Sequence, residues 1–208
     1  MIPLFVDCSG KRIVIFGGGE VASRKAAYFS GEADVLVVSR SFSHKMSLLP
    51  VERRMSDTGR ASDEELNGII DRAFLVIGAL SDPDQNNRIN NLCKQREILF
   101  NSADGETGDV IIPAMSGGKN YMLAISTKGD SPAISRFIRE HLESHFPALD
   151  EMIALQRDLR ALLKNTEPSQ SRRNEILREV LNDRELWKNL KTDPTGARLI
   201  VKERYLHE

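Results

Sequence analysis

The sequence predicts a doubly wound α/β fold followed by a helical region, and three observations support this. Short runs of β-branched residues alternate with helix-like segments through residue 101, an order typical of a parallel sheet covered by helices. Three consecutive glycines end the first run, at residues 17–19. No strand-like run of any length follows Pro147. We therefore expect an α/β domain first and helices last.

Short apolar runs are expected to form the parallel sheet. Each is rich in Val, Ile, Leu or Phe, as buried strands are, although the third run is weaker than the others. The runs span residues 12–19, 34–39, 51–55, 73–80 and 97–101.

Helices are expected between several of these runs, and two of them carry clear start signals. Ser62 with Glu65 three residues later forms a capping-box pattern. Asp82 can cap the next helix, and Pro83 suits its first position. The expected helices span residues 20–31, 62–70 and 81–96.

The pattern changes beyond the sheet. Residues 109–115 and 121–127 are strand-like and too close in sequence for a helical crossover, so an antiparallel pair is expected. A helix over residues 131–146 begins with Ser131 and Pro132. Further helices are expected at roughly 148–164, 169–181 and 183–190.

The chain is expected to divide into three parts. An α/β domain comes first, a small segment of two strands and a helix follows, and a helical domain ends the chain. These parts span residues 1–108, 109–146 and 147–208.

Composition limits the classes of function. The chain has 29 basic and 30 acidic residues and a net charge of −1, so nothing predicts a nucleic-acid or anionic-membrane partner. No apolar run is long enough to span a bilayer. Cys8 and Cys93 are far apart and have no CxxC partner, which favours reduced thiols in a cytoplasmic protein.

Residues 17–22 form the pattern G-x-G-x-x-A between an expected strand and an expected helix. This context is typical of a Rossmann-like dinucleotide site. Gly17 allows the tight turn, Gly19 lets backbone approach a pyrophosphate, and Ala22 permits close packing of helix on strand. The alternative is a glycine turn without a ligand.

The acid that usually binds the adenosine ribose is missing. Ser39, Arg40 and Ser41 stand where an Asp or Glu is expected. Arg40 would suit the 2′-phosphate of NADP, but a solvated surface arginine explains it equally well. The residues therefore predict a dinucleotide without choosing which one.

Asp104 is the candidate for proton transfer. It lies just past the expected fifth strand, at the edge where open α/β sheets bind ligands, and a carboxylate there can act as a base. The alternative is an ordinary turn aspartate. His141 and His145 lie four residues apart and could form a metal pair, although a solvent-facing pair is the simpler interpretation.

Five separated blocks of the sequence agree in order and spacing with a known family. They lie at residues 17–26, 76–89, 100–104, 110–114 and 123–143. Together they resemble the precorrin-2 dehydrogenase and sirohydrochlorin ferrochelatase family, the dehydrogenase–chelatase module of siroheme synthases. The resemblance covers roughly residues 1–146.

The resemblance implies NAD-dependent oxidation of precorrin-2 to sirohydrochlorin in siroheme biosynthesis. In some members Fe²⁺ is then inserted as a substrate, for which Asp104 and His141 are weak metal candidates here. It also implies a homodimer in which residues 109–146 exchange contacts between subunits. A non-catalytic NAD(H)-binding sensor and an NADP-linked reductase of another small substrate remain alternatives.

The resemblance and the glycine motif together give the expected site residues. Asp104 would be the catalytic carboxylate, and Thr127 and Ser131 would border the tetrapyrrole cleft. The expected cofactor contacts are Gly17, Gly18, Gly19, Glu20, Val21, Ser39, Ser41 and Phe42.

Overall fold

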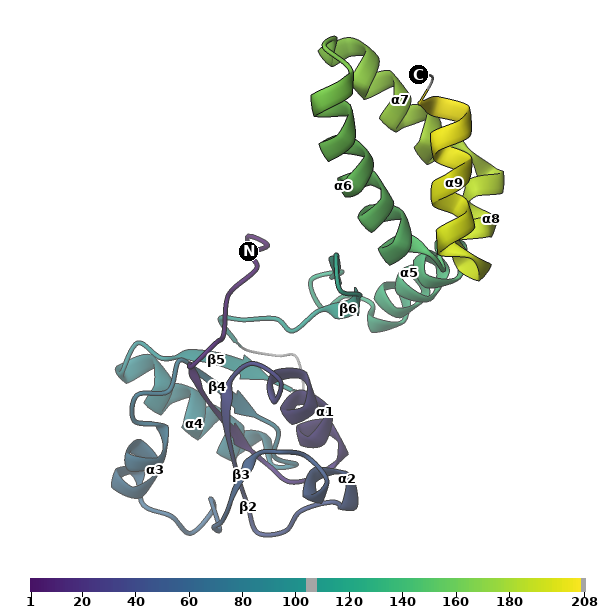
Figure 1. The fold of residues 1–208 in the computed structure, drawn as a ribbon. Helices are drawn as coiled ribbons and strands as arrows, with labels where there is room; N and C mark the ends of the chain where they lie inside the picture. The colour runs from purple at the N-terminus through teal and green to yellow at the C-terminus, as the bar shows by residue number, and fades with distance from the viewer. Residues whose placement is uncertain (104–107, 207–208) are drawn as a thin grey trace. The chain divides into compact units, whose positions relative to one another are not determined.

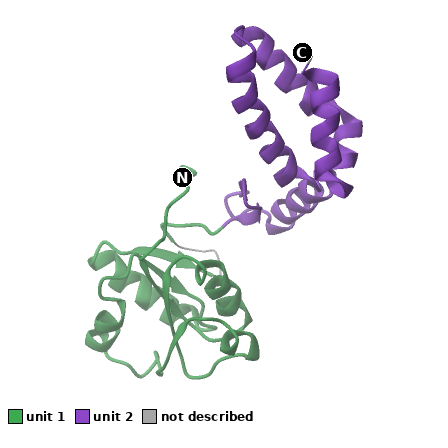
Figure 2. Cartoon of the chain, viewed as in Figure 1, with its two compact units in different colours: residues 1–112 green, residues 113–208 purple. Residues whose placement is uncertain are grey.

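A computed structural model describes residues 1–103 and 108–206 of the chain. The chain divides into two compact units, Met1–Ile112 and Pro113–Glu208 (Figure 2). Each unit has its own buried apolar core. Asp104, the expected catalytic carboxylate, lies outside the described residues.

The first unit is built on a sheet with the strand order β3-β2-β1-β4-β5 (Figure 1). Neighbouring strands pair in parallel throughout, so the predicted doubly wound sheet is confirmed. The strand order reverses between β1 and β4. The strands are β1 (Arg12–Phe16), β2 (Asp34–Ser39), β3 (Glu52–Met55), β4 (Leu75–Gly78) and β5 (Leu99–Ser102).

Helices cover both faces of this sheet. Ile13 and Ile15 of β1 share an apolar cluster with the first two helices, whereas Val14 and Phe16 share one with the next two. Burial on both faces explains why the central strands β1 and β4 are apolar, whereas the edge strand β3 is exposed and carries charged residues. The helices are α1 (Glu20–Phe29), α2 (His44–Ser47), α3 (Asp63–Ile70) and α4 (Pro83–Gln95).

Side-chain caps fix the starts of α2, α3 and α4. Ser62 and Glu65 form the predicted capping box at α3, and Asp82 caps α4 as predicted. The short α2 was not predicted, and it begins where the hydroxyl of Ser43 accepts from the backbone N–H of Met46. The caps hold the loops that follow the strands.

The prediction of a strand over residues 109–115 is wrong for residues 109–113, which fold back on β5. The N–H of Asp109 donates to the carbonyl of Phe100 at 2.8 Å, and its carboxylate accepts from the Phe100 N–H at 3.1 Å. The amide of Asn101 donates to the carbonyl of Val110 at 2.7 Å. This segment therefore occupies backbone groups of an edge strand that would otherwise be open to pairing.

The second unit begins with the antiparallel pair β6 (Ala114–Gly117) and β7 (Met122–Ile125), which confirms the predicted pairing with shorter strands. Among the described residues no helix is long and apolar enough to cross a membrane. The helices of this unit are α5 (Pro132–His145), α6 (Leu149–Thr166), α7 (Gln170–Asn182), α8 (Arg184–Thr192) and α9 (Pro194–Tyr205).

Helix α9 was not predicted from the sequence, where Pro194 and Gly196 obscure it. Asp193 starts this helix by accepting from the N–H of Gly196 at 2.9 Å, and Pro194 fits the first turn. Ala197 and Val201 then enter the buried core of the second unit. The last helix is therefore part of the packed fold.

Candidate cofactor site

A hollow of about 570 Å³ lies at the carboxyl ends of β1, β2, β3 and β4. Its size is within the range of small-molecule sites in proteins. Open α/β sheets bind ligands at this edge, beside the reversal of strand order, which here falls between β1 and β4. The lining residues are 17–19, 39–43, 56–59, 79–82 and Gln85.

The glycine turn after β1 leaves no room for side chains at Gly17 and Gly18. Gly17 has a φ of +123°, and a Cβ there would run into the carbonyl oxygen of Ala79. A Cβ on Gly18 would run into the carbonyl oxygen of Ser41 and would lie 2.9 Å from the hydroxyl of Ser39. Bare backbone at this turn is what a pyrophosphate requires for close approach.

The start of α1 can accept an anion. Gly19 precedes the helix, and no side chain caps the first turn, where free N–H groups and the helix dipole favour negative charge. The hydroxyl of Ser23 donates to the Gly19 carbonyl at 2.9 Å and lies 2.8 Å from the hydroxyl of Ser43. The loop after β2 is thereby tied to the helix start, and the turn fits a dinucleotide.

The structure brings most of the predicted cofactor residues together. Glu20 and Val21 do not line the hollow: Glu20 pairs with Lys45 at 2.6 Å, and Val21 is exposed on the first turn of α1. Their contact with a cofactor stays a prediction. The predicted residues that line it are Gly17, Gly18, Gly19, Ser39, Ser41 and Phe42.

Several lining residues were missed by the sequence prediction. Residues 56–59 follow β3, and residues 79–82 follow β4. The rule that ligands bind at the carboxyl ends of strands could have identified both loops. Gln85 comes from the first turns of α4 and has no such signal in the sequence.

Thr127 and Ser131, the predicted substrate residues, lie at the start of α5 in the second unit. The hydroxyl of Thr127 donates to the Ser131 carbonyl at 3.0 Å and accepts from the Ser131 N–H at 3.1 Å. The hydroxyl of Ser131 caps the helix by accepting from the N–H of Ile134 at 3.4 Å. Both side chains therefore shape the loop before α5.

His141 lies on α5 between two other rings. Its ring centroid is 6.1 Å from that of Phe137 and 5.5 Å from that of His145, and both pairs are stacked. Among residues 1–103 and 108–206, no group of three or more His, Cys, Asp or Glu side chains is placed to hold a metal ion.

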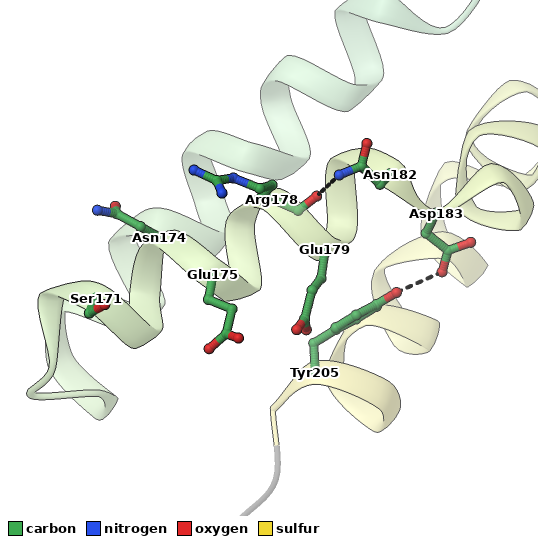
Figure 3. Close-up of a pocket in the computed structure, with 8 residues that line it drawn as sticks. All are labelled: Ser171, Asn174, Glu175, Arg178, Glu179, Asn182, Asp183 and Tyr205. Atoms are coloured by element: carbon green, nitrogen blue, oxygen red, sulfur yellow. Dashed lines mark hydrogen bonds between the residues drawn. The ribbon is translucent and has the colours of Figure 1, made fainter.

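A second, more open hollow of about 930 Å³ lies on the helical unit (Figure 3). Figure 3 shows the hydroxyl of Tyr205 directed at Asp183, whose carboxylate accepts from it at 2.9 Å. Asp183 also caps α8, and Glu175 pairs with Arg172 at 2.6 Å. None of the buried unpartnered side-chain atoms recorded for the described residues lies in this wall. Tyr205, Asp183 and Glu175 therefore already have partners within the helical unit.

Comparison with known proteins connects this geometry to a family. The family model described as "Putative NAD(P)-binding" matches residues 4–114. A precorrin-2 dehydrogenase of Methanosarcina barkeri is 41% identical over an alignment of 191 residues, which covers 89% of this chain and 85% of that protein. A siroheme synthase of Sodalis glossinidius is 30% identical over 186 residues, covering 88% of this chain and 39% of that protein.

The fold has a counterpart among solved structures. The structure of SirC, a precorrin-2 dehydrogenase, matches 99% of this chain and 98% of its own chain, with a TM-score of 0.69 and 22% identity. The likeness concerns the fold, and it extends over nearly the whole chain.

Proposed function

Because the chain belongs to the precorrin-2 dehydrogenase family, we propose that it oxidises precorrin-2 to sirohydrochlorin with NAD, in siroheme biosynthesis. The 41% identity that spans 85% of the Methanosarcina barkeri dehydrogenase carries this conclusion. The chain is an oxidoreductase of that family, and the cofactor hollow supplies the site that such chemistry needs. The free thiols of Cys8 and Cys93 support a reducing compartment, the cytoplasm.

The residues around the hollow fit a dinucleotide, which supplies a hydride acceptor when bound. The glycine turn and the uncapped start of α1 would hold the pyrophosphate. Ser39 and Ser41 would hold the adenosine ribose, and Phe42 would line its side of the hollow. Glu20 and Val21 would add contacts from the first turn of α1.

The proposal is for NAD rather than NADP. No carboxylate stands at the end of β2, and the exposed Arg40 lines the hollow there. The guanidinium of Arg40 could also attract the 2′-phosphate of NADP, so the residues alone do not choose between the two cofactors. The family resemblance is what supports NAD. Parallel titrations with NAD and NADP test this, and tighter binding of NADP would contradict it.

Asp104 is proposed as the base that takes a proton from the macrocycle as the hydride leaves. It stands two residues beyond Ser102, the last residue of β5, so its chain position follows a strand end at the ligand edge. An aspartate at neutral pH is ionised and able to accept a proton. The oxidation then removes one hydride and one proton from precorrin-2.

A homodimer is proposed to form through the 109–146 segment. On α5 the side chains of Ile134, Phe137 and Ile138 are 50%, 65% and 38% exposed. They lie on one helical face, because residues three and four positions apart are neighbours on a helix, and they remain exposed among the described residues. An exposed apolar face of this kind is typical of a protein interface.

Thr127 and Ser131 are proposed to border the precorrin-2 cleft. Their loop precedes the exposed α5 face, so formation of the homodimer would affect the same region.

Insertion of Fe²⁺ into sirohydrochlorin is a separate proposal, with Asp104 or His141 as the residues that would assist. It is tested by adding Fe²⁺ or Co²⁺ to sirohydrochlorin without NAD.

The decisive experiment for the proposed function is a spectroscopic assay of the purified chain with precorrin-2 and NAD. We expect NADH and sirohydrochlorin to appear together in equal amounts. Binding of NAD without any spectral change would contradict the dehydrogenase and favour a cofactor sensor. Turnover with NADP but not NAD, on another small substrate, would favour a reductase.

A further inference from the structure

Two buried side-chain oxygens of the cofactor hollow have no hydrogen-bond partner among the described residues. They are Oγ1 of Thr58, a residue only 5% exposed, and Oε1 of Gln85. Buried unpartnered atoms of Arg12 and Asn101 also occur, but these residues do not line the hollow. Because buried polar atoms are normally paired, two orphans in one hollow indicate a ligand that completes their hydrogen bonds.

Other groups hold the start of α4, so the amide of Gln85 is not needed for that purpose. Asp82 caps the helix and accepts from the backbone N–H of Gln85 at 3.4 Å. The amide of Asn86 exchanges hydrogen bonds with the backbone of Leu80 at 3.2 and 3.0 Å. The helix start is thereby fixed to the end of β4, and the side-chain amide of Gln85 stays available.

The loop containing Thr58 is fixed against the same helix. Arg88 donates to the carbonyl oxygens of Thr58 and Ala61 at 3.4 and 2.8 Å, and it pairs with Asp63 at 2.6 Å. Arg88 lies three residues after Gln85, on the same side of α4. Thr58 and Gln85 therefore belong to the same part of the wall.

The order of the strands indicates which part of a dinucleotide reaches this wall. In this fold the pyrophosphate lies at the start of the first helix, and the adenosine ribose lies at the end of β2. The next strand outward is β3, and Thr58 follows it. Beyond the ribose, on the side of β3, the next group of the dinucleotide is the adenine base.

Adenine offers the groups that these side chains lack. Its amino group donates and its ring nitrogens accept, and a side-chain amide matches this pair in protein–nucleic acid contacts. A threonine hydroxyl can donate to a ring nitrogen or accept. We infer that Gln85 and Thr58 recognise the adenine base and make the site selective for adenine nucleotides. This inference rests on the proposed dinucleotide site.

Asp57 is a further acceptor beside Thr58, but its carboxylate is engaged within its own turn. It accepts from the N–H of Gly59 at 3.1 Å and pairs with Arg60 at 3.6 Å. Its role is to close the loop after β3. Recognition of the base therefore falls to Gln85 and Thr58.

Calorimetric titration of the whole chain tests the inference with two ligands. One is NAD, and the other is its etheno-adenine analogue, in which a bridge removes the amino donor. The unchanged chain should bind NAD about tenfold more tightly than the analogue. Gln85→Leu should bind NAD about tenfold more weakly and should lose that discrimination. Gln95→Leu, at an exposed position at the end of α4, is the matched control. It should keep the NAD affinity and the discrimination against the analogue.

Thermal unfolding without cofactor separates recognition from a structural role. Thr58→Val and Gln85→Leu each remove a buried unpaired oxygen, so the free chain should unfold at the same or a higher temperature. The same variants should bind NAD more weakly. If both variants retain the NAD affinity and the discrimination of the unchanged chain, the inference is overturned, and the proposed cofactor is not affected. If the unchanged chain does not bind NAD, the proposed cofactor fails and the inference fails with it.

Discussion

The hollow of the first unit and helix α5 of the second leave opposite kinds of groups unsatisfied. In the hollow, Thr58 and Gln85 carry buried oxygens that have no partner in the described part of the chain. On α5, Ile134 and Phe137 carry apolar side chains that remain at least half exposed. An unpaired buried oxygen requires a polar ligand, whereas an exposed apolar face requires another surface. In the functions proposed above, the first unit recognises the cofactor and the second unit forms the homodimer contact.

The largest expected effect tests whether the first unit supplies chemistry as well as cofactor binding. Loss of a general base lowers a rate by a factor of about 10²–10⁴, so Asp104→Asn should reduce kcat by at least about 100-fold. The affinity for NAD should stay unchanged, because the side chain is proposed to act on the macrocycle. Stopped-flow absorbance measures the rate, and calorimetry measures the affinity.

A matched control for this substitution is Glu64→Gln, which changes an exposed carboxylate on α3 and should keep full activity. Near-full activity of Asp104→Asn would reject the proposed base. The first unit would then bind the cofactor without supplying the proton acceptor.

The next effect concerns the glycine turn. In Gly18→Ala the new Cβ meets the carbonyl oxygen of Ser41, so the loop after β2 must move. Overpacking of this kind costs about 1–3 kcal/mol in the free energy of unfolding, and NAD affinity should fall with it. Gly68→Ala in α3 has open space around its Cβ and should stabilise the chain by about 0.5–1 kcal/mol. Equal free energies of unfolding for the two variants in urea titrations would contradict the steric clash at Gly18.

A third experiment tests the assembly side of the contrast. Phe137→Lys places a charge on the exposed face of α5, and we expect it to weaken the proposed homodimer by about tenfold or more. Leu199→Lys, on α9, is the control, because the two side chains are similarly exposed: Leu199 is 57% exposed and Phe137 is 65% exposed. Light scattering over a concentration series measures the mass. Equal masses for both variants would place the dimer contact elsewhere.

The parts that the sequence predicted depend on local patterns. Buried parallel strands are continuously apolar, and the tight turn at residues 17–19 needs glycine, so both could be recognised in advance. The loop that contains Thr58 follows a strand end and could also be recognised. Its closeness to Gln85 could not, because it depends on Arg88 fastening the loop after β3 to α4. Residues 109–113 resemble a strand in composition but bond irregularly to β5. Long-range contacts decide each of these cases.

The smallest expected effect concerns a polar group that the second unit pairs internally. The carboxylate of Asp150 accepts from the N–H groups of Asn120 and Lys119 at 2.7 and 3.0 Å. These bonds, that of Asn120 first, hold the pKa of Asp150 below its ordinary value of 3.8. A carboxyl whose pKa is lowered by folding stabilises the fold above its ordinary pKa, and that contribution is lost as pH falls through the lowered value.

Asp150→Asn should therefore lower the Tm slightly at neutral pH, and the difference from the unchanged chain should vanish in acid. Scanning calorimetry at several pH values measures it, with Glu151→Gln as a control at an exposed neighbour. A difference that persisted in acid would mean that Asp150 acts through packing rather than charge. In that case the charge of Asp150 would not be what holds the β6–β7 turn to α6. The contrast between this paired carboxylate and the unpaired oxygens of Thr58 and Gln85 would then be lost.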